Sequence, residues 1–115
     1  MNSNIEAFVF DDEDYRQRYF ALMLFDVVKL LDEIKPDVLE KLAQENYSFR
    51  PAGDRVFITY EPTEERLTTP REIRDGIFID IGSMSAKDIL KFISALFEKF
   101  EVSKSRFYIL IKNHK

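Results

Sequence analysis

The sequence predicts a single α+β domain, an α/β sandwich in which two main helices pack on one face of a four-stranded sheet. Three observations predict this fold. The 115 residues suit one domain, the apolar fraction of 45% can fill one core, and the apolar spacing switches repeatedly between strand and helix periods. The predicted order is β-α-(α)-β-β-α-β, as in ferredoxin-like folds, and residues 1–115 form one domain.

The first part of the chain is expected to hold a strand followed by two helices. Residues 5–10 (IEAFVF) favour a strand, and the acidic residues 11–14 (DDED) suit the N-terminus of the next helix. Apolar side chains then recur at helical steps as far as Ile34. Residues 19–28 (YFALMLFDVV) can also be read as a strand buried on both faces, although the helix is favoured. A short second helix is expected over residues 36–46.

The middle of the chain combines one strand with a long polar segment. Residues 55–60 (RVFITY) are β-branched and aromatic, as in a strand. Residues 63–75 (TEERLTTPREIRD) are polar, contain Pro70 and show no sustained period. We therefore expect a loop there, long for a domain of this size.

The most regular part of the sequence is a strand-helix-strand unit in its last third. Residues 76–81 (GIFIDI) are expected to form a central strand, and residues 106–111 (RFYILI) a final one. Between them, Ser85 and Asp88 follow the capping-box pattern at the start of a helical apolar repeat. A helix that joins two strands of one sheet predicts that the strands run parallel.

Composition narrows the function classes. The formal net charge of -4 is spread along the chain and offers no basic footprint for nucleic acid. The chain has no cysteine, which excludes a disulfide framework, a thiolate nucleophile and cysteine-based metal sites. Residues 1–10 do not resemble a signal peptide and no apolar stretch is long enough for a membrane span. A cytosolic location is the simplest interpretation, with secretion without a signal peptide left open.

Few residues are suited to chemistry. The single histidine, His114, lies next to the end of the sequence, so no serine has a histidine nearby to activate it and no metal or cofactor site is expected. Arg50 could bind a carboxylate through its two-pronged guanidinium, although a solvated loop arginine is the simpler interpretation. Tyr108 could line a polar pocket or serve packing. Asp80, inside an apolar strand, needs a partner or a path to solvent.

Residues 50–62 (RPAGDRVFITYEP), followed by GIFIDIG and SAKDILKFISALFEKFEVSKSRFYILI, resemble the macrophage migration inhibitory factor and D-dopachrome tautomerase family. The resemblance covers residues 50–111. It implies a trimer in which neighbouring subunits join sheet edges, with pockets between subunits lined by Arg50, Ile81 and Tyr108. Joining edges by assembly would suit a small domain.

The resemblance lacks the residue that gives the family its activity. Family tautomerases use an N-terminal proline as the base that moves a proton in a keto-enol pair. This chain has Asn2 there, and a second alignment, with residues 19–28 as the first family strand, makes residues 1–18 an N-terminal extension. Neither alignment supplies the proline, and Leu110 stands where family members carry a polar asparagine.

Three hypotheses follow. The first is a diverged, non-catalytic tautomerase-fold protein that acts through protein contacts, or by binding a small carboxylate ligand at a subunit interface. The second is a keto-enol tautomerase with a different base, in which Arg50 orients the substrate carboxylate and Tyr108 polarises its carbonyl. The third is an acidic, ferredoxin-like interaction or inhibitor module of the immunity type, suggested by residues 11–14. All three lack a cofactor.

Overall fold

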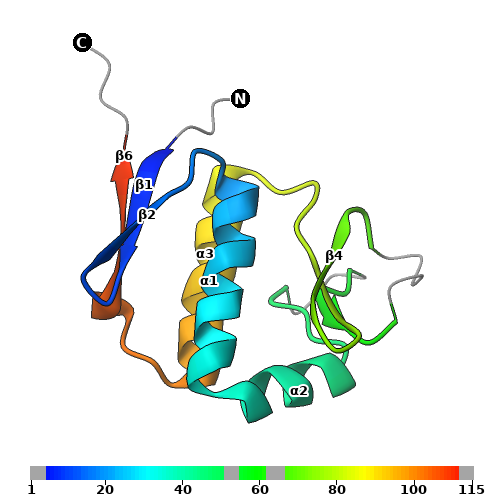
Figure 1. The fold of residues 1–115 in the computed structure, drawn as a ribbon. Coiled ribbons are helices and arrows are strands. Elements are labelled where there is room, and N and C mark those ends of the chain that lie inside the picture. Colours follow the sequence, from blue (N-terminus) through cyan, green and yellow to red (C-terminus); the bar gives the residue numbers. More distant parts are fainter. Residues whose placement is uncertain (1–4, 51–54, 62–66, 112–115) are drawn as a thin grey trace.

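The structure, a computed structural model, describes residues 5–50, 55–61 and 67–111. Two three-stranded antiparallel sheets, β2-β1-β6 and β3-β5-β4, lie on either side of a layer made by α1 and α3 (Figure 1). The elements in chain order are β1 Ile5–Phe10, β2 Glu13–Arg16, α1 Phe20–Ile34, α2 Pro36–Gln44, β3 Ile58–Thr59, β4 Pro70–Arg74, β5 Ile77–Asp80, α3 Ala86–Phe100, the 3-10 turn Lys104–Arg106 and β6 Phe107–Ile111.

The predicted α+β class is confirmed, but the single four-stranded sheet with helices on one face is wrong. The reason lies in α3, which is apolar on two sides. On one side Phe97 packs against Phe10 and Phe107, with ring centroids 6.0 and 5.6 Å apart. On the other side Phe92 packs against Phe57, at 5.1 Å. A helix buried on two sides needs a cover on each, so β5 and β6 belong to different sheets and the predicted parallel pair does not form.

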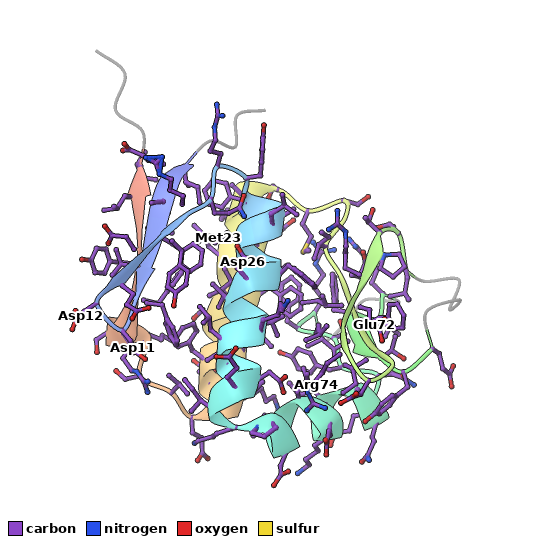
Figure 2. The ribbon with its side chains drawn as sticks, viewed as in Figure 1. Asp11, Asp12, Met23, Asp26, Glu72 and Arg74 are labelled. Atoms are coloured by element: carbon purple, nitrogen blue, oxygen red, sulfur yellow. The ribbon has the colours of Figure 1, made fainter. Side chains whose placement is uncertain are left out.

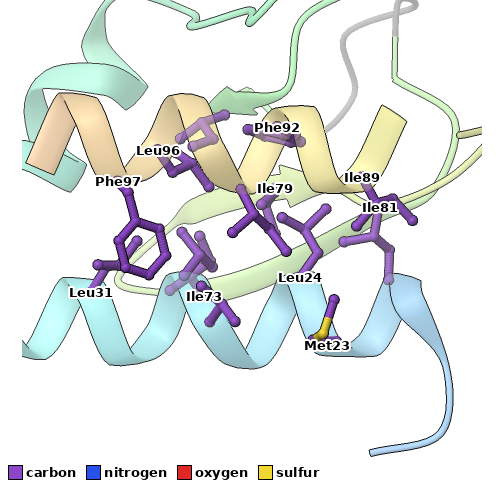
Figure 3. Packing of buried hydrophobic residues seen from close by; sticks show 14 of the residues in the cluster. Met23, Leu24, Leu31, Ile73, Ile79, Ile81, Ile89, Phe92, Leu96 and Phe97 are labelled. Atoms are coloured by element: carbon purple, nitrogen blue, oxygen red, sulfur yellow. The ribbon is translucent and has the colours of Figure 1, made fainter. Parts of the chain in front are cut away.

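The helix α1 has the same two-sided burial. Its buried residues include Met23, Leu24, Val27, Val28 and Leu31, which occupy more than one stripe of the helix. Figure 3 shows the side chains between α1, α3 and the neighbouring sheet. The apolar run of residues 19–28, interrupted only by Asp26 and ambiguous in the sequence, therefore belongs to a helix between two sheets, and the helical interpretation is confirmed.

The acidic residues 11–14 do not cap a helix, and that prediction is wrong. Asp11 and Asp12 form a two-residue turn between β1 and β2, with φ of 54° and 66°. Positive φ at both turn positions suits the twist of a tight hairpin, and aspartate tolerates it better than most residues. Figure 2 shows both side chains at this turn. The helix α1 begins later, without acidic residues in its first turn.

A second hairpin of the same type joins β4 to β5. Its turn is Asp75 and Gly76, with φ of 47° and 80°. Residues 70–74, predicted as part of a loop, are thus a strand, whereas residues 63–66 of that loop lie outside the described residues. The Asp-Gly pair is a strong hairpin signal, and the polar character of β4 concealed it.

The other elements follow the sequence closely. The strands at residues 5–10, 76–81 and 106–111 and the short helix α2 are confirmed within one or two residues. The strand at 55–60 is shorter, with only Ile58–Thr59 in the sheet. Ser85 and Asp88 form the predicted capping box at the start of α3. In the described part of the chain no helix is long and apolar enough to cross a membrane.

Candidate functional site

Arg50 forms an ion pair within the chain. Its Nη2 donates to Asp88 Oδ2 at 2.9 Å, and both side chains are about one-third exposed. The guanidinium also lies over the rings of Phe49 and Phe57, at 5.4 and 5.6 Å from their centroids. The same Asp88 carboxylate caps α3 with Ser85. Arg50 therefore ties the segment after α2 to the start of α3, and a carboxylate ligand would compete with Asp88 for it.

The three residues suggested by the family resemblance are not gathered into one site within a single chain. Ile81 follows β5 and belongs to the buried core. Tyr108 lies on β6 in the other sheet, where its side chain is 55% exposed. Arg50 and Ile81 are thus in the half of the molecule built around β3-β5-β4, and the helical layer separates that sheet from β6 (Figure 1). A pocket shared between subunits stays a prediction.

Asp80 is fully buried and has a complete set of partners. Its Oδ2 accepts hydrogen bonds from Arg55 Nη2 (2.8 Å) and the backbone N–H of Thr68 (2.9 Å). Its Oδ1 accepts from the N–H groups of Thr69 (2.9 Å) and Gly82 (3.0 Å) and from the Thr68 hydroxyl (3.1 Å). With both oxygens occupied, the carboxylate has little capacity left to bind a ligand.

We call Asp80 and its hydrogen-bond partners the Asp80 centre, and its role is structural. Burial alone would raise the pKa of Asp80, but the hydrogen bonds from Arg55 and from the backbone of Gly82, Thr69 and Thr68 outweigh it and hold the pKa below its ordinary value. Arg55 also donates to the carbonyl of Ser83 at 3.0 Å. The centre joins the segment before β4 to the segment after β5. It also supplies the hydrogen-bond partners that a buried aspartate needs.

The free edge of β6 is the most unusual surface of the described chain. β6 lies at the edge of the sheet β2-β1-β6, and its five residues, FYILI, carry no charge. Tyr108, Leu110 and Ile111 are 55%, 37% and 61% exposed. An edge strand presents unpaired backbone groups, and proteins usually protect such edges with charged residues or proline. Within the described residues, this edge has neither.

The other edge of the same sheet is protected. β2 has the sequence EDYR, three of whose four residues are charged and exposed. The two edge strands of this sheet therefore differ in sequence, since β2 is charged and β6 is not. We call the outward edge of β6, together with the exposed side chains of Tyr108, Leu110 and Ile111, the β6 edge.

The register of the sheet decides which backbone groups of β6 point outward. β6 pairs antiparallel with β1, with Val9 opposite Tyr108 and Ala7 opposite Leu110. Just beyond the strand, the N–H of Asp11 donates to the carbonyl of Arg106 at 2.9 Å. Because hydrogen-bonded pairs alternate along an antiparallel ladder, Tyr108 and Leu110 use their backbone groups towards β1. The N–H of Phe107 donates to the carbonyl of Lys104 in the 3-10 turn. The groups open at the free edge are therefore the carbonyl of Phe107 and both backbone groups of Ile109 and Ile111.

The start of β6 is fixed by an ion pair. Arg106 Nε and Nη2 donate to the two oxygens of Asp11 at 2.6 and 2.7 Å, which joins the β1–β2 turn to the first residue before the strand. The hydrogen bond from Arg106 is the main cause that lowers the pKa of Asp11. This contact gives the β6 edge a defined end and leaves no unpaired charge there.

Two hollows could receive small ligands, but neither contains a residue predicted for the site. One, of about 410 Å³, is lined by the side chains of Leu42 and Phe100 with three lysines and three carboxylates around them. The other, of about 390 Å³, lies beside Tyr19 with Arg16 and Arg18 on its rim. In the parts of the chain that the structure describes, no three histidine or carboxylate side chains gather as a metal site would require.

Inspection of the sequence missed the β6 edge, although the signal was present. Residues 106–111 were expected to form the final strand of a single sheet, without a prediction of whether that strand is central or at an edge. Only the partner strands decide whether such a strand is central or at an edge, and here that partner, β1, lies about a hundred residues earlier in the chain. The contrast with the charged segment EDYR was the available clue.

Comparisons with known proteins give this chain no family: no family model, no curated protein and no solved structure matches it.

Proposed function

We propose that this protein is a protein-interaction module that binds an extended polypeptide strand along the β6 edge. The proposal rests on a single observation. In the sheet β2-β1-β6, the edge strand β6 is uncharged and exposed, whereas the strand at the opposite edge, β2, is charged. Strand addition would satisfy the outward backbone groups of Ile109 and Ile111 and the carbonyl of Phe107. It would also cover the exposed side chains of Tyr108 and Leu110.

The proposal keeps one part of what the family resemblance implies, the joining of sheet edges, and does not depend on the rest. The trimer, the small carboxylate ligand and the pocket of Arg50, Ile81 and Tyr108 remain predictions. Among the three hypotheses from the sequence, the β6 edge supports those that act through protein contacts. The acidic residues 11–14, which suggested an interaction module, contribute to the hairpin next to this edge.

The experiment is a selection of random short peptides, displayed on phage, against the immobilised protein. We expect enrichment of peptides rich in β-branched and aromatic residues, because such residues favour the strand that must be added. Hydrogen exchange of the selected complex should slow at the amides of Ile109 and Ile111. Selection of compact or helical peptides that leave these amides unchanged would contradict the proposal.

A matched pair of variants separates backbone pairing from side-chain contact. Ile109→Pro removes the outward N–H, whereas Ile109→Ala shortens the same side chain and keeps the N–H. We expect Ile109→Pro to weaken peptide binding by about tenfold and Ile109→Ala to weaken it less. Equal losses in the two variants would mean that the peptides do not add to the sheet.

A further inference from the structure

We infer that the strand that occupies the β6 edge is β6 of a second copy of this chain, so that two sheets join into one six-stranded sheet around a twofold axis. The inference rests on the proposed function, since it names the partner of the same edge. Twofold dimers use one surface patch on both subunits, so the patch must be complementary to itself. The β6 edge meets that requirement in its backbone, its side chains and its charge.

The backbone pattern fits a register centred on Ile109. In an antiparallel pair centred there, Ile109 exchanges hydrogen bonds with its own copy, and Phe107 faces Ile111 of the second copy, whose N–H can donate to the Phe107 carbonyl. The Phe107 N–H already donates to the carbonyl of Lys104. Moving the centre to Tyr108 places Ile111 opposite Ser105, outside the strand, and backbone groups left unpaired and shielded from water are costly.

Side chains match in the same register. Tyr108 of one copy lies opposite Leu110 of the other, and an aromatic residue facing an aliphatic one is a favourable cross-strand pair. Both residues are on the exposed face, at 55% and 37%, so the pairing shields apolar surface that a single chain leaves in water. Phe107 faces Ile111, which is 61% exposed in the single chain.

Within the described strand, charge does not oppose the pairing. From Phe107 to Ile111 the strand carries no charge, so between these residues of the two copies no like charges face each other. The cation just before the strand, Arg106, is already neutralised by Asp11. The charged strand β2, by contrast, would place Glu13, Asp14 and Arg16 in any joint made at the other edge. Self-association is therefore directed to β6.

The oligomeric state tests the inference first. Sedimentation velocity of the full chain from micromolar to millimolar concentration should show a mass that rises from 13.6 kDa towards twice that value. Ile109→Pro should remain monomeric over the same range, and Ile109→Ala should still associate. A wild-type chain that stays monomeric throughout overturns the second-copy inference. Peptides that bind this monomer and protect the amides of Ile109 and Ile111 would leave the proposed function standing.

Cross-linking tests the register. The chain contains no cysteine, so single cysteine variants report one contact each. Opposite residues in a pair that does not exchange hydrogen bonds are about 4.5 Å apart between Cα atoms, within the range of a disulfide. Mild oxidation of a mixture of Tyr108→Cys and Leu110→Cys should therefore give mainly the mixed disulfide, identified by its mass.

The homodimers serve as controls in the same tube. With the axis at Ile109, two copies of residue 108 are diagonal neighbours about 7–8 Å apart, too far for an unstrained disulfide. A predominance of Tyr108→Cys homodimers would move the axis to Tyr108 and overturn the register. A dimer that Ile109→Pro leaves intact, or one without any disulfide at these positions, would use another surface and overturn the inference.

Discussion

Arg74 on β4 holds Asp32 on α1 through two parallel hydrogen bonds, from Nε to Oδ2 at 2.7 Å and from Nη2 to Oδ1 at 3.0 Å. The same guanidinium donates to the carbonyl of Pro36 at 3.2 Å and lies 3.4 Å from Glu40 on α2. The hydrogen bonding of Arg74 to the Asp32 carboxylate is the main cause that raises the pKa of Arg74 above its ordinary value. One side chain thus joins a strand and two helices, near α2 in Figure 2.

Loss of this contact should destabilise the fold. Arg74→Ala leaves Asp32, which is 8% exposed, without its partner, and we expect the free energy of unfolding to fall by about 2–3 kcal/mol. Urea denaturation followed by circular dichroism measures this. Arg71→Ala, an exposed arginine on the same strand, is the control and should change stability by less than about 0.5 kcal/mol. Similar losses in both variants would contradict a specific role for Arg74.

Position 82 requires glycine because Thr68 and Thr69, which donate hydrogen bonds to Asp80, leave no room for a side chain there. A Cβ built at Gly82 would lie 2.5 Å from Thr68 Oγ1 and closer still to Thr69 Oγ1. We expect Gly82→Ala to cost about 2–3 kcal/mol of stability through this overlap. Gly76→Ala has no such overlap, and only its φ of 80° opposes alanine, so its cost should be about 1 kcal/mol. Thermal unfolding of both variants compares the two effects, and the reverse order would contradict this packing.

The Asp80 centre should make stability depend on pH in the acid range. The pKa of Asp80 is lower in the folded chain than its ordinary value of 3.8, so folding favours the ionised form. The stabilisation is therefore complete above about pH 4–5 and is lost as the pH falls through the folded-state pKa. Urea unfolding between pH 7 and pH 2 measures the slope.

Asp80→Asn is the comparison for the acid range. The substitution removes the charge that faces Arg55, so we expect a loss of about 3 kcal/mol at pH 7. Between pH 4 and pH 2 its stability should fall less steeply than that of the wild-type chain, because other carboxylates alone then contribute. Equal slopes in the two proteins would mean that Asp80 does not carry the effect.

The alternation of backbone groups along β6 can be tested in the single chain. Tyr108→Pro removes an N–H that the register directs towards β1, whereas Ile109→Pro removes one that points outward. We expect Tyr108→Pro to destabilise the chain by about 3 kcal/mol and Ile109→Pro by about as much as Ile109→Ala. Chemical denaturation in dilute solution, where association is weakest, gives the comparison. Greater damage from Ile109→Pro would reverse the assignment of the outward groups.

The tautomerase alternative has a direct assay. We expect no enol-keto conversion of phenylpyruvate above the buffer rate, because the N-terminal proline base is absent from the sequence and Arg50 is paired with Asp88. Absorbance of the enol follows the reaction. Turnover that is lost in both Arg50→Ala and Tyr108→Phe would instead establish the subunit-interface pocket that the family resemblance implies, with circular dichroism to show that both variants fold.

Local signals in the sequence were sufficient for most elements. The capping box of Ser85 and Asp88 and the helical repeat behind it predicted α3 from side-chain chemistry within one turn. Pro36 predicted the start of α2 in the same way. Such interactions join residues close in sequence, so a reader of the chain alone can recognise them.

The arrangement of layers could not be predicted because it depends on contacts distant in sequence. Asp11 and Arg106 are 95 residues apart, and Arg74 and Asp32 are 42 apart. The second apolar side of α3, carried by Phe97, is present in the sequence, but the predicted fold placed the helices on one face of a single sheet. The candidate site was limited by distant contacts in the same way. Arg50 was identified as a candidate residue, but its partner Asp88 was assigned only to the helix cap. The β6 edge could not be identified without the strand order.

The pairing of β1 with β6 has a consequence for the folding of a chain made from its N-terminus. β1 is the central strand of its sheet, yet one of its neighbours, β6, is synthesised about a hundred residues later. Until then, only the local β1–β2 hairpin covers one edge of the apolar strand IEAFVF. This unfinished sheet is prone to aggregate during synthesis, and closure of the long loop between its strands should set the folding rate.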